Sequence, residues 1–296
     1  MVGIFVEYVL SEQRTLPCNC FLSPMMMPFF LSGTAGKLFC VYHEASGDSD
    51  ERGDLIFLPP FAEELNQSRH TVVRMARCLA RRGWGVLLLD LFGTGDSEGM
   101  FEECRWEIWR QDVMAAHAWL RDRGRNAVGL WGLRLGALLA ADAAAAHPRL
   151  FSRLVLWQPV TSGKPFLNQF LRIRAFGALI RDSESLETRS ELRQRLASGK
   201  LIHVAGYPLT PTLAQDLDEL DMAILVPGSA TPVLWFEVVA ASSAQLSPAG
   251  RRIVDAWRNH GAAVTVVPVT DTPFWSVQAL EPVFANQLIT ATAEAL

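Results

Sequence analysis

The sequence predicts an α/β fold: a doubly wound, mainly parallel sheet interrupted by a helical cap insertion. From Gly36 onward, strand and helix signals alternate along the chain. The predicted strands are continuous apolar runs, which is typical of parallel sheets covered on both faces. The alternation breaks once, over residues 162–222, where the sequence is charged and helical. Right-handed crossovers would join these strands into one sheet, and ligands of such sheets bind beyond the carboxyl ends of the strands.

The elements before the insertion are predicted from apolar runs and from helical spacing. Pro59 and Pro60 end a short apolar run, as expected where a buried strand stops. Apolar residues at 72, 73, 75, 76, 79 and 80 form one helical stripe. The strands expected here are Lys37–His43, Asp54–Phe61, Gly85–Leu91, Ala127–Leu133 and Leu154–Val160, and the helices are Asn66–Arg82, Trp106–Arg123 and Gly136–His147.

The insertion and the remainder of the chain complete the predicted order. Two helices are expected in the insertion, and two strand–helix pairs follow it: Asn168–Ile180 and Glu184–Ser198, then Pro232–Val239, Pro248–His260, Ala263–Val269 and Leu280–Ala295. The expected division is therefore a loose leader over 1–27, a first core part over 28–161, a cap or lid over 162–222 and a second core part over 223–296.

Composition excludes several classes of protein. The chain has 296 residues, with 27 Lys and Arg against 31 Asp and Glu, a net charge of −4. A nucleic-acid-binding protein would carry a basic excess, so no nucleic-acid partner is expected. Five scattered cysteines without a CxxC pair argue against a disulfide framework or a structural zinc site and favour the cytoplasm. We expect no metal and no cofactor. We also expect no integral membrane segment, because no apolar stretch is long enough to span a bilayer.

The most informative motif follows the predicted strand Ala127–Leu133. There the chain reads Gly132-Leu133-Arg134-Leu135-Gly136 and continues into an Ala-rich helix. A strand, a G-x-X-x-G turn and a helix form a nucleophile elbow in hydrolases, where the central residue attacks the substrate. Here that residue is Arg134, and a guanidinium cannot act as a nucleophile. The alternative is an ordinary turn in which the glycines only allow close packing.

The chain resembles the α/β-hydrolase superfamily and, more narrowly, the exosortase A system-associated hydrolase 2 family. The segments that carry the resemblance are PFFL at 28–31, KLFCVYH at 37–43, PFAEELNQSR at 60–69, LDLFGTGDSEG at 89–99, LWGLRLGALLA at 130–140, LWQPVTSGK at 156–164, VAGYPLT at 204–210 and PFW at 273–275. The resemblance covers the chain from about residue 28 to its end. It implies the fold, the description as a hydrolase, and an association with bacterial exopolysaccharide loci.

A Ser-His-acid triad does not fit this sequence. In the superfamily the order is nucleophile, acid, histidine, and the first position holds Arg134. The acid usually follows the strand Pro232–Val239, but the nearest carboxylate, Glu237, falls inside that strand. The histidine usually follows the next strand, where Thr270–Pro273 contains none. The conventional mechanism therefore fails at two of its three positions, and the third is doubtful.

Two interpretations of Arg134 remain open. At a helix N-terminus, its guanidinium would suit an anion such as phosphate, sulfate or carboxylate. Alternatively, it forms an internal salt bridge with Glu63, Glu64 or Asp96. The catalytic role is unassigned, with Arg134, Glu63, Glu64 and the substitute nucleophile Ser97 as candidates. The residues expected to bind substrate or anion are Arg134, Glu63, Glu64, Asn66, Asp96, Ser97, Trp131, Gln158 and Trp275.

Two classes of function fit these observations. One is an atypical hydrolase with an esterase-like or acyl-hydrolase-like reaction, linked to exopolysaccharide or exosortase loci and carrying Arg in place of the elbow nucleophile. The other is a catalytically inactive pseudo-hydrolase that binds an anion, another ligand or a partner protein. In both cases the expected ligand is a small acyl or sugar-derived molecule, and a homodimer is left open.

Overall fold

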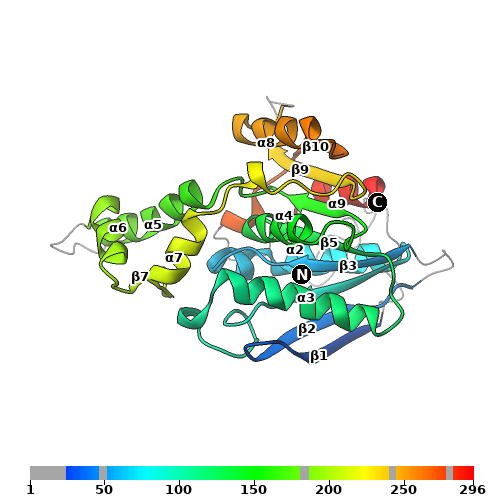
Figure 1. Ribbon diagram of the computed structural model, residues 1–296, viewed down its shortest axis with the longest axis horizontal. Coiled ribbons are helices and arrows are strands. Elements are labelled where there is room, and N and C mark those ends of the chain that lie inside the picture. The colour runs from blue at the N-terminus through cyan, green and yellow to red at the C-terminus, as the bar shows by residue number, and fades with distance from the viewer. Residues whose placement is uncertain (1–24, 47–51, 181–186, 240–244, 278–282) are drawn as a thin grey trace, which may run out of the picture.

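The computed structural model describes residues 25–46, 52–180, 187–239, 245–277 and 283–296, without the side chains of 175–180. An eight-stranded sheet runs through the molecule in the order β1-β2-β4-β3-β5-β6-β9-β10 (Figure 1). Its strands are β1 (Met26–Ser32), β2 (Lys37–His43), β3 (Gly53–Leu58), β4 (Trp84–Leu89), β5 (Val128–Leu133), β6 (Leu154–Trp157), β9 (Val233–Val239) and β10 (Val264–Thr270). β2 pairs antiparallel with both β1 and β4, and the remaining neighbours in the sheet, from β4 through β3, β5, β6 and β9 to β10, pair in parallel. The sheet is therefore mainly parallel, which confirms the predicted fold class.

Helices cover both faces of this sheet because its strands are apolar on both sides. Leu55 and Phe57 of β3 pack in one core cluster, whereas Ile56 and Leu58 pack in the other. The first cluster lies under α2 (Glu63–Ala80) and α9 (Asn286–Ala295). The second lies under α3 (Trp106–Arg121), α4 (Leu135–Ala146) and α8 (Pro248–Asn259). Because helices cover both faces of the sheet, ligands can reach it at the end where the carboxyl ends of the parallel strands lie.

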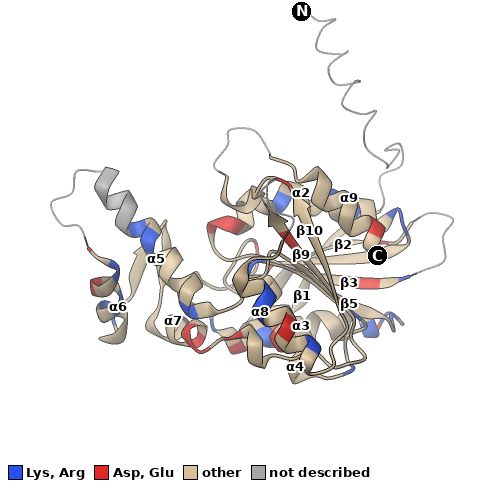
Figure 2. Ribbon diagram, turned by 90° about the horizontal axis from the view of Figure 1, so that it is seen from above, with Lys and Arg blue, Asp and Glu red and all other residues tan. Residues whose placement is uncertain are grey.

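Between β6 and β9 the chain leaves the sheet. It forms α5 (Gly163–Ile180), α6 (Arg189–Ala197), the hairpin of β7 (Ile202–Val204) and β8 (Tyr207–Leu209), and α7 (Pro211–Asp218). Figures 1 and 2 both show α5, α6 and α7 to one side of the sheet. Short 3-10 turns complete the chain: η2 (Phe101–Glu103), η3 (Met222–Ile224) and η4 (Phe274–Ser276). Whether α5 to α7 act as a cap stays a prediction.

Several boundaries differ from the sequence-based expectation. β1 begins at Met26, within the range 1–27 expected to be a loose leader, and residues 1–24 lie outside the described residues. α2 begins at Glu63 rather than Asn66, so Glu63 and Glu64 occupy its first turn instead of a loop. Carboxylates are stabilised in a first turn by the helix dipole, although they break the apolar stripe that marks the helix. Parts of two expected helices, 184–186 and 280–282, lie outside the described residues.

No helix in the described part of the chain combines the length and the apolar character needed to cross a bilayer. Across the same residues, the His, Cys, Asp and Glu side chains form no group that could hold a metal ion.

His43, at the end of β2, makes the stability of the fold sensitive to acid. Its side chain is fully buried, and neither ring nitrogen has a hydrogen-bond partner among the described residues. Burial, and secondly the charge of Arg77, lowers the pKa of His43 to about 4. The unfolded chain takes up the proton at an ordinary pKa, so the free energy of unfolding falls as the pH drops from about 6.5 to about 4.

We expect His43→Leu to remove this part of the pH dependence. At about pH 4, the burial of one such histidine should lower the free energy of unfolding by about 3 kcal/mol relative to neutral pH. Urea unfolding of wild type and variant at several pH values between 7 and 4 measures it. The exposed His203 provides the control, because His203→Leu should leave the slope unchanged. Parallel pH profiles of wild type and His43→Leu would show that burial of His43 has no such effect.

Candidate functional site

Arg134 occupies a strained turn between β5 and α4. Its backbone has φ 57° and ψ −116°, a conformation that residues other than glycine rarely adopt. The turn is held by the backbone N–H of Arg134, which donates to the carbonyl of Trp157 at 3.0 Å. Strain of this kind costs about 1–3 kcal/mol and persists only where the surrounding structure imposes it. The turn therefore fixes Arg134 at the carboxyl end of β5.

Two glycines allow this turn to form. A Cβ on Gly132 would lie 2.4 Å from the carbonyl oxygen of Gly136, and a Cβ on Gly136 would lie 2.1 Å from that of Leu58. The start of α4 is thus pressed against the end of β3. Across this contact, Ala62 precedes α2 with a similar strained backbone, φ 53° and ψ −126°. Two strained turns therefore bring the first residues of α2 and α4 to the same edge of the sheet.

A cavity of about 300 Å³ lies at this edge beside α5. Its polar residues come from α2, from the elbow, from α5 and from the turn η4, and its apolar walls are mainly aromatic. The lining residues are Phe61, Glu63, Glu64, Gln67, Arg134, Phe166, Gln169, Phe170, Ile173, Trp275 and Ser276. The ring of Phe61 contacts those of Phe166 and Phe170, with centroids 5.7 and 5.0 Å apart. These contacts join α5 to the sheet edge.

An ion pair between Arg134 and Glu64 forms the polar centre of the cavity. Arg134 Nε donates to Glu64 Oε1 at 3.2 Å, and both side chains are largely buried, with 14% and 17% exposed. Burial raises the pKa of Glu64, and the guanidinium of Arg134 opposes this rise. The Arg134 guanidinium carbon also lies 5.6 Å from the ring centroid of Trp275. Of the three carboxylates considered as partners of Arg134, the structure places Glu64 beside it.

Glu63 lies next to this pair without a cation of its own among its described contacts. Burial raises its pKa, and a hydrogen bond from its own backbone N–H acts in the opposite direction. Because two carboxylates share the cavity with one guanidinium, an excess of negative charge lies in a partly water-excluded space.

The other residues expected at the site lie elsewhere. Asn66 is exposed, and Asp96 donates its backbone N–H to Asp90. Ser97 Oγ accepts from the backbone N–H of Phe39 and donates to the carbonyl of Asp90, so both of its hydrogen-bonding roles serve the loop. Trp131 packs between Phe57 and Trp157 in the core.

Gln158 and Glu237 also have structural contacts. Gln158 accepts from the backbone N–H of Val238. Glu237 lies inside β9, where it accepts from Trp235 and from Ser247, the residue that precedes α8. The usual acid position, 240–244, lies outside the described residues.

Seven lining residues were missed by the sequence analysis. In α2, Gln67 follows Glu63 by four positions and Glu64 by three, which is the spacing of one helix face. In α5, Phe166, Gln169, Phe170 and Ile173 form a similar stripe. Helical spacing could have grouped each set. It could not have shown that the two faces meet, because that contact joins segments about 100 residues apart in the chain.

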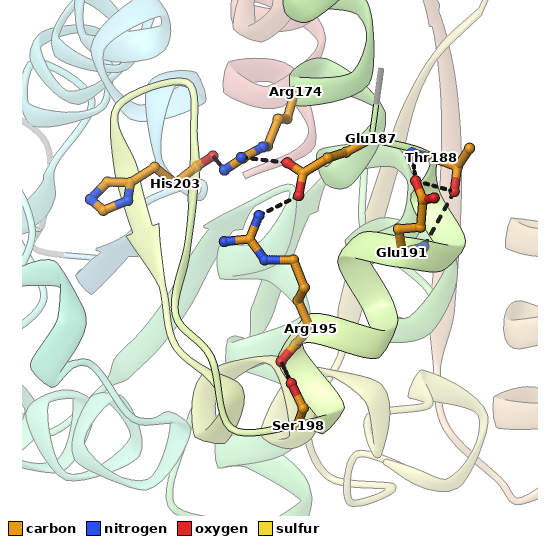
Figure 3. Close-up of polar contacts among 7 residues, drawn as sticks. All are labelled: Arg174, Glu187, Thr188, Glu191, Arg195, Ser198 and His203. Atoms are coloured by element: carbon orange, nitrogen blue, oxygen red, sulfur yellow. Dashed lines mark hydrogen bonds and ion pairs between the residues drawn. The ribbon is translucent and has the colours of Figure 1, made fainter. Parts of the chain in front are cut away.

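A network of ion pairs holds α5 to α6 beyond the cavity (Figure 3). Arg174 of α5 and Arg195 of α6 both point toward Glu187, and Arg174 Nη2 lies 2.5 Å from Glu187 Oε2. Arg174 also donates to the backbone carbonyl of His203, whose ring points away from the network. Burial raises the pKa of Glu187, but the hydrogen bonds and charges of Arg195 and Arg174 together outweigh it and hold the pKa below its usual value. Glu187 therefore links the helix that lines the cavity to its neighbour.

We expect Glu187→Gln to loosen this region while leaving the sheet intact. Because the paired side chains are partly exposed, losing the ion pairs should cost about 1 kcal/mol of local stability. The fraction of molecules in which α6 is locally unfolded should then rise roughly fivefold. Limited proteolysis, with the cleavage sites located by mass spectrometry, should show faster cutting between 187 and 203. Glu107→Gln removes an exposed ion pair on α3 and serves as the control. Equal cutting rates for Glu187→Gln and wild type would contradict a linking role.

The sheet order, the antiparallel pair at one edge and the strained strand–turn–helix at Arg134 together define an α/β-hydrolase fold. The family model described as serine aminopeptidase, S33, matches residues 52–203, just over half of the chain. The chain belongs to this family, in the α/β-hydrolase clan.

Similar solved structures agree on the fold. Est1E from Butyrivibrio proteoclasticus with bound ferulic acid has a TM-score of 0.64 at 15% identity, covering 90% of this chain and 95% of its own. The structure of DcsB in complex with a substrate analogue has a TM-score of 0.59 at 15% identity, and the match covers 91% of this chain and 97% of DcsB. An α/β serine hydrolase homologue from Coxiella burnetii has a TM-score of 0.53 at 15% identity, and the match covers 93% of this chain and 97% of the homologue. No curated protein matches the chain.

Proposed function

We propose that this hydrolase-like protein binds a small sugar-derived or acyl ligand in the cavity beside α5 without forming an acyl-enzyme. The observation that carries the proposal is the side chain at the elbow. Arg134 stands where a nucleophile would attack, and it is paired with Glu64 at 3.2 Å. A guanidinium has no electron pair to offer an acyl carbon and keeps its proton at physiological pH. The elbow geometry then serves to place a charged pair rather than a nucleophile.

The residues around Arg134 supply no replacement for the missing groups. No histidine or cysteine is among the residues that line the cavity. Ser276 lines it, but its Oγ donates to the carbonyl of Pro273, and the described lining contains no imidazole that could remove its proton. The turn after β10 that usually provides the histidine continues through Asp271, Thr272 and Pro273. Nucleophilic catalysis needs a base within hydrogen-bond reach of the attacking group, which these contacts do not provide.

The chemistry of the lining supports the proposed class of ligand. Aromatic rings, two carboxylates, two amides and a guanidinium surround a volume of about 300 Å³. Such walls offer apolar faces together with several hydrogen-bonding groups, as small-molecule sites commonly do. The resemblance to the exosortase A system-associated hydrolase 2 family, which accompanies exopolysaccharide loci, favours a sugar-derived ligand over a simple fatty acyl group.

Atypical hydrolysis is a second candidate, favoured by the two carboxylates. Burial raises the pKa values of both Glu63 and Glu64, which brings them toward the range suited to general acid–base catalysis. In that mechanism Glu63 would remove a proton from a water molecule as the water attacks the carbonyl carbon of an ester. The bond from that carbon to the alcohol oxygen would then break, and the alcohol would leave with the proton returned by Glu63. No covalent intermediate would form, and the reaction would depend on Glu63.

A combined labelling and turnover experiment separates these functions. We expect purified wild type to show no adduct after incubation with a fluorophosphonate and no hydrolysis of p-nitrophenyl acetate above buffer. We also expect members of a panel of neutral monosaccharides, amino sugars, uronic acids and N-acyl sugars to raise the melting temperature of wild type, by more than they raise that of Arg134→Met.

Three results would contradict the proposal. An adduct that disappears in Ser97→Ala would reveal a relocated nucleophile. Turnover without an adduct, lost in Glu63→Gln, would establish the carboxylate mechanism. A panel in which no compound stabilises wild type more than Arg134→Met would remove the binding function.

A further inference from the structure

The cavity contains hydrogen-bond acceptors that have no donors. Glu63, Glu64 and Gln67 all line it. Each carries one buried oxygen without a hydrogen-bond partner among the described residues: Glu63 Oε2, Glu64 Oε2 and Gln67 Oε1. Leaving one buried polar atom unsatisfied costs about 1–3 kcal/mol, and three within one cavity are unusual. Among the described residues, these three acceptors are therefore left without a donor.

The local structure of α2 explains why these acceptors gather. Gln67 lies three positions after Glu64 and four after Glu63, so it is a neighbour of both on the helix surface, and all three lie at the N-terminal end of α2. The helix dipole favours the ionised form of carboxylates at this end. Burial opposes ionisation, as the raised pKa values of Glu63 and Glu64 indicate. A positively charged group entering the cavity would resolve this conflict.

The charges and walls of the cavity favour a cation over an anion. Arg134 is the single cationic side chain among the lining residues, and its Nε is committed to Glu64. The formal charge of the lining is therefore −1 when both carboxylates are ionised. Phe61, Phe166, Phe170 and Trp275 supply aromatic rings, whose faces attract cations. A neutral hydroxyl group could donate to the same oxygens, but it would leave the excess charge in place.

We propose that Glu63, Glu64 and Gln67 form a subsite for a protonated amine of the ligand, with the aromatic walls holding the apolar part beside it. This inference rests on the proposed binding function and specifies the chemical class of the ligand. An ammonium group carries three N–H donors, whereas the unpartnered side-chain oxygens of these residues need donors. It also neutralises the charge that Arg134 leaves uncompensated. The ligand is accordingly an amine, such as an amino sugar or an amine-bearing acyl compound, rather than a uronic acid.

Three probes of similar shape test this chemistry: benzylamine, benzyl alcohol and benzoate. They share a phenyl ring suited to the aromatic walls and differ only in the polar group. Binding is measured for the full chain by calorimetry and by the shift in melting temperature. Charge-assisted hydrogen bonds should make benzylamine bind roughly tenfold or more tighter than benzyl alcohol, and benzoate should bind weakest.

Glu63→Gln provides the matched variant, because it removes the uncompensated charge and keeps the shape. It should reduce the preference for benzylamine over benzyl alcohol to about threefold or less, by weakening the charge-assisted contact. Glu294→Gln makes the same change at an exposed position on α9 and should leave the preference intact.

The inference is overturned if benzoate binds as tightly as benzylamine, if no probe binds, or if Glu63→Gln keeps the full preference. These outcomes are independent of the fluorophosphonate and ester results, which test the proposed function itself. A protein that forms a fluorophosphonate adduct and hydrolyses the ester could still bind benzylamine best. A protein that shows neither reaction could still bind benzoate best.

Discussion

Gly136→Ala is expected to destabilise the protein more than any other small substitution discussed above. The added Cβ would lie 2.1 Å from the carbonyl oxygen of Leu58 and 2.6 Å from that of Pro59, both rigid backbone atoms. Alanine is the better helix former, so propensity alone would favour the change by about 1 kcal/mol. Steric overlap outweighs it, because α4 and β3 must separate to admit a methyl group. We expect a loss of about 3–5 kcal/mol, or roughly 10 °C in melting temperature.

Chemical denaturation of Gly136→Ala and a control tests this expectation. Gly228 is the control because a Cβ there would meet only atoms at 3.8 Å or more, an ordinary contact distance. Gly228→Ala should change the free energy of unfolding by no more than about 0.5 kcal/mol. If both variants unfold at the same denaturant concentration, the elbow is not packed as tightly as the structure indicates.

Arg134→Met should produce the second large effect, because it leaves Glu64 buried without its cation. Removing one partner of a buried ion pair costs about 3 kcal/mol or more. Burial already raises the pKa of Glu64, and loss of the opposing guanidinium raises it further. The carboxyl group can then escape the cost by taking up a proton, which is easier at low pH. The destabilisation should therefore be largest near about pH 8 and shrink toward about pH 5.

Unfolding curves of wild type and Arg134→Met at both pH values measure this difference. Lys37→Met is the matched control, since Lys37 and Glu98 form an exposed ion pair at 3.8 Å with more than half of each side chain in solvent. That control should cost less than about 1 kcal/mol at either pH. A loss for Arg134→Met that is equally small, or that grows as the pH falls, would contradict the buried pair.

The order of the core elements could be predicted because it is encoded locally. The continuous apolar run of β5 predicts a buried strand, and the apolar stripe of α2 predicts a helix with one buried face. β1 was missed because it is an edge strand with exposed Met26, Met27 and Phe30, so neither alternation nor a buried run marks it. The first turn of α2 was missed because Ala62 precedes it without a capping side chain and two glutamates precede its apolar stripe.

The candidate site could be predicted in part. The elbow motif directs attention to Arg134, and the adjacent loop offers Glu63 and Glu64 as its partners. The choice of Glu64 depends on the direction in which α2 begins, which a strained backbone at Ala62 sets. Ser97 was a candidate substitute nucleophile because it is a hydroxyl residue just after a predicted strand, where ligands of such sheets bind. Its two hydrogen bonds to backbone groups appear only once β2 and the loop after β4 are placed together.

Arg134 and Glu64 form an ion pair at the turn after β5, and we propose that this pair takes the place of a nucleophile there. A double-mutant cycle over wild type, Arg134→Met, Glu64→Gln and the double variant measures their coupling from four free energies of unfolding at about pH 8. The account predicts a coupling of about 2 kcal/mol, with the double variant more stable than Arg134→Met alone. Additive effects within about 0.5 kcal/mol would contradict it, because they would show that the two side chains do not interact.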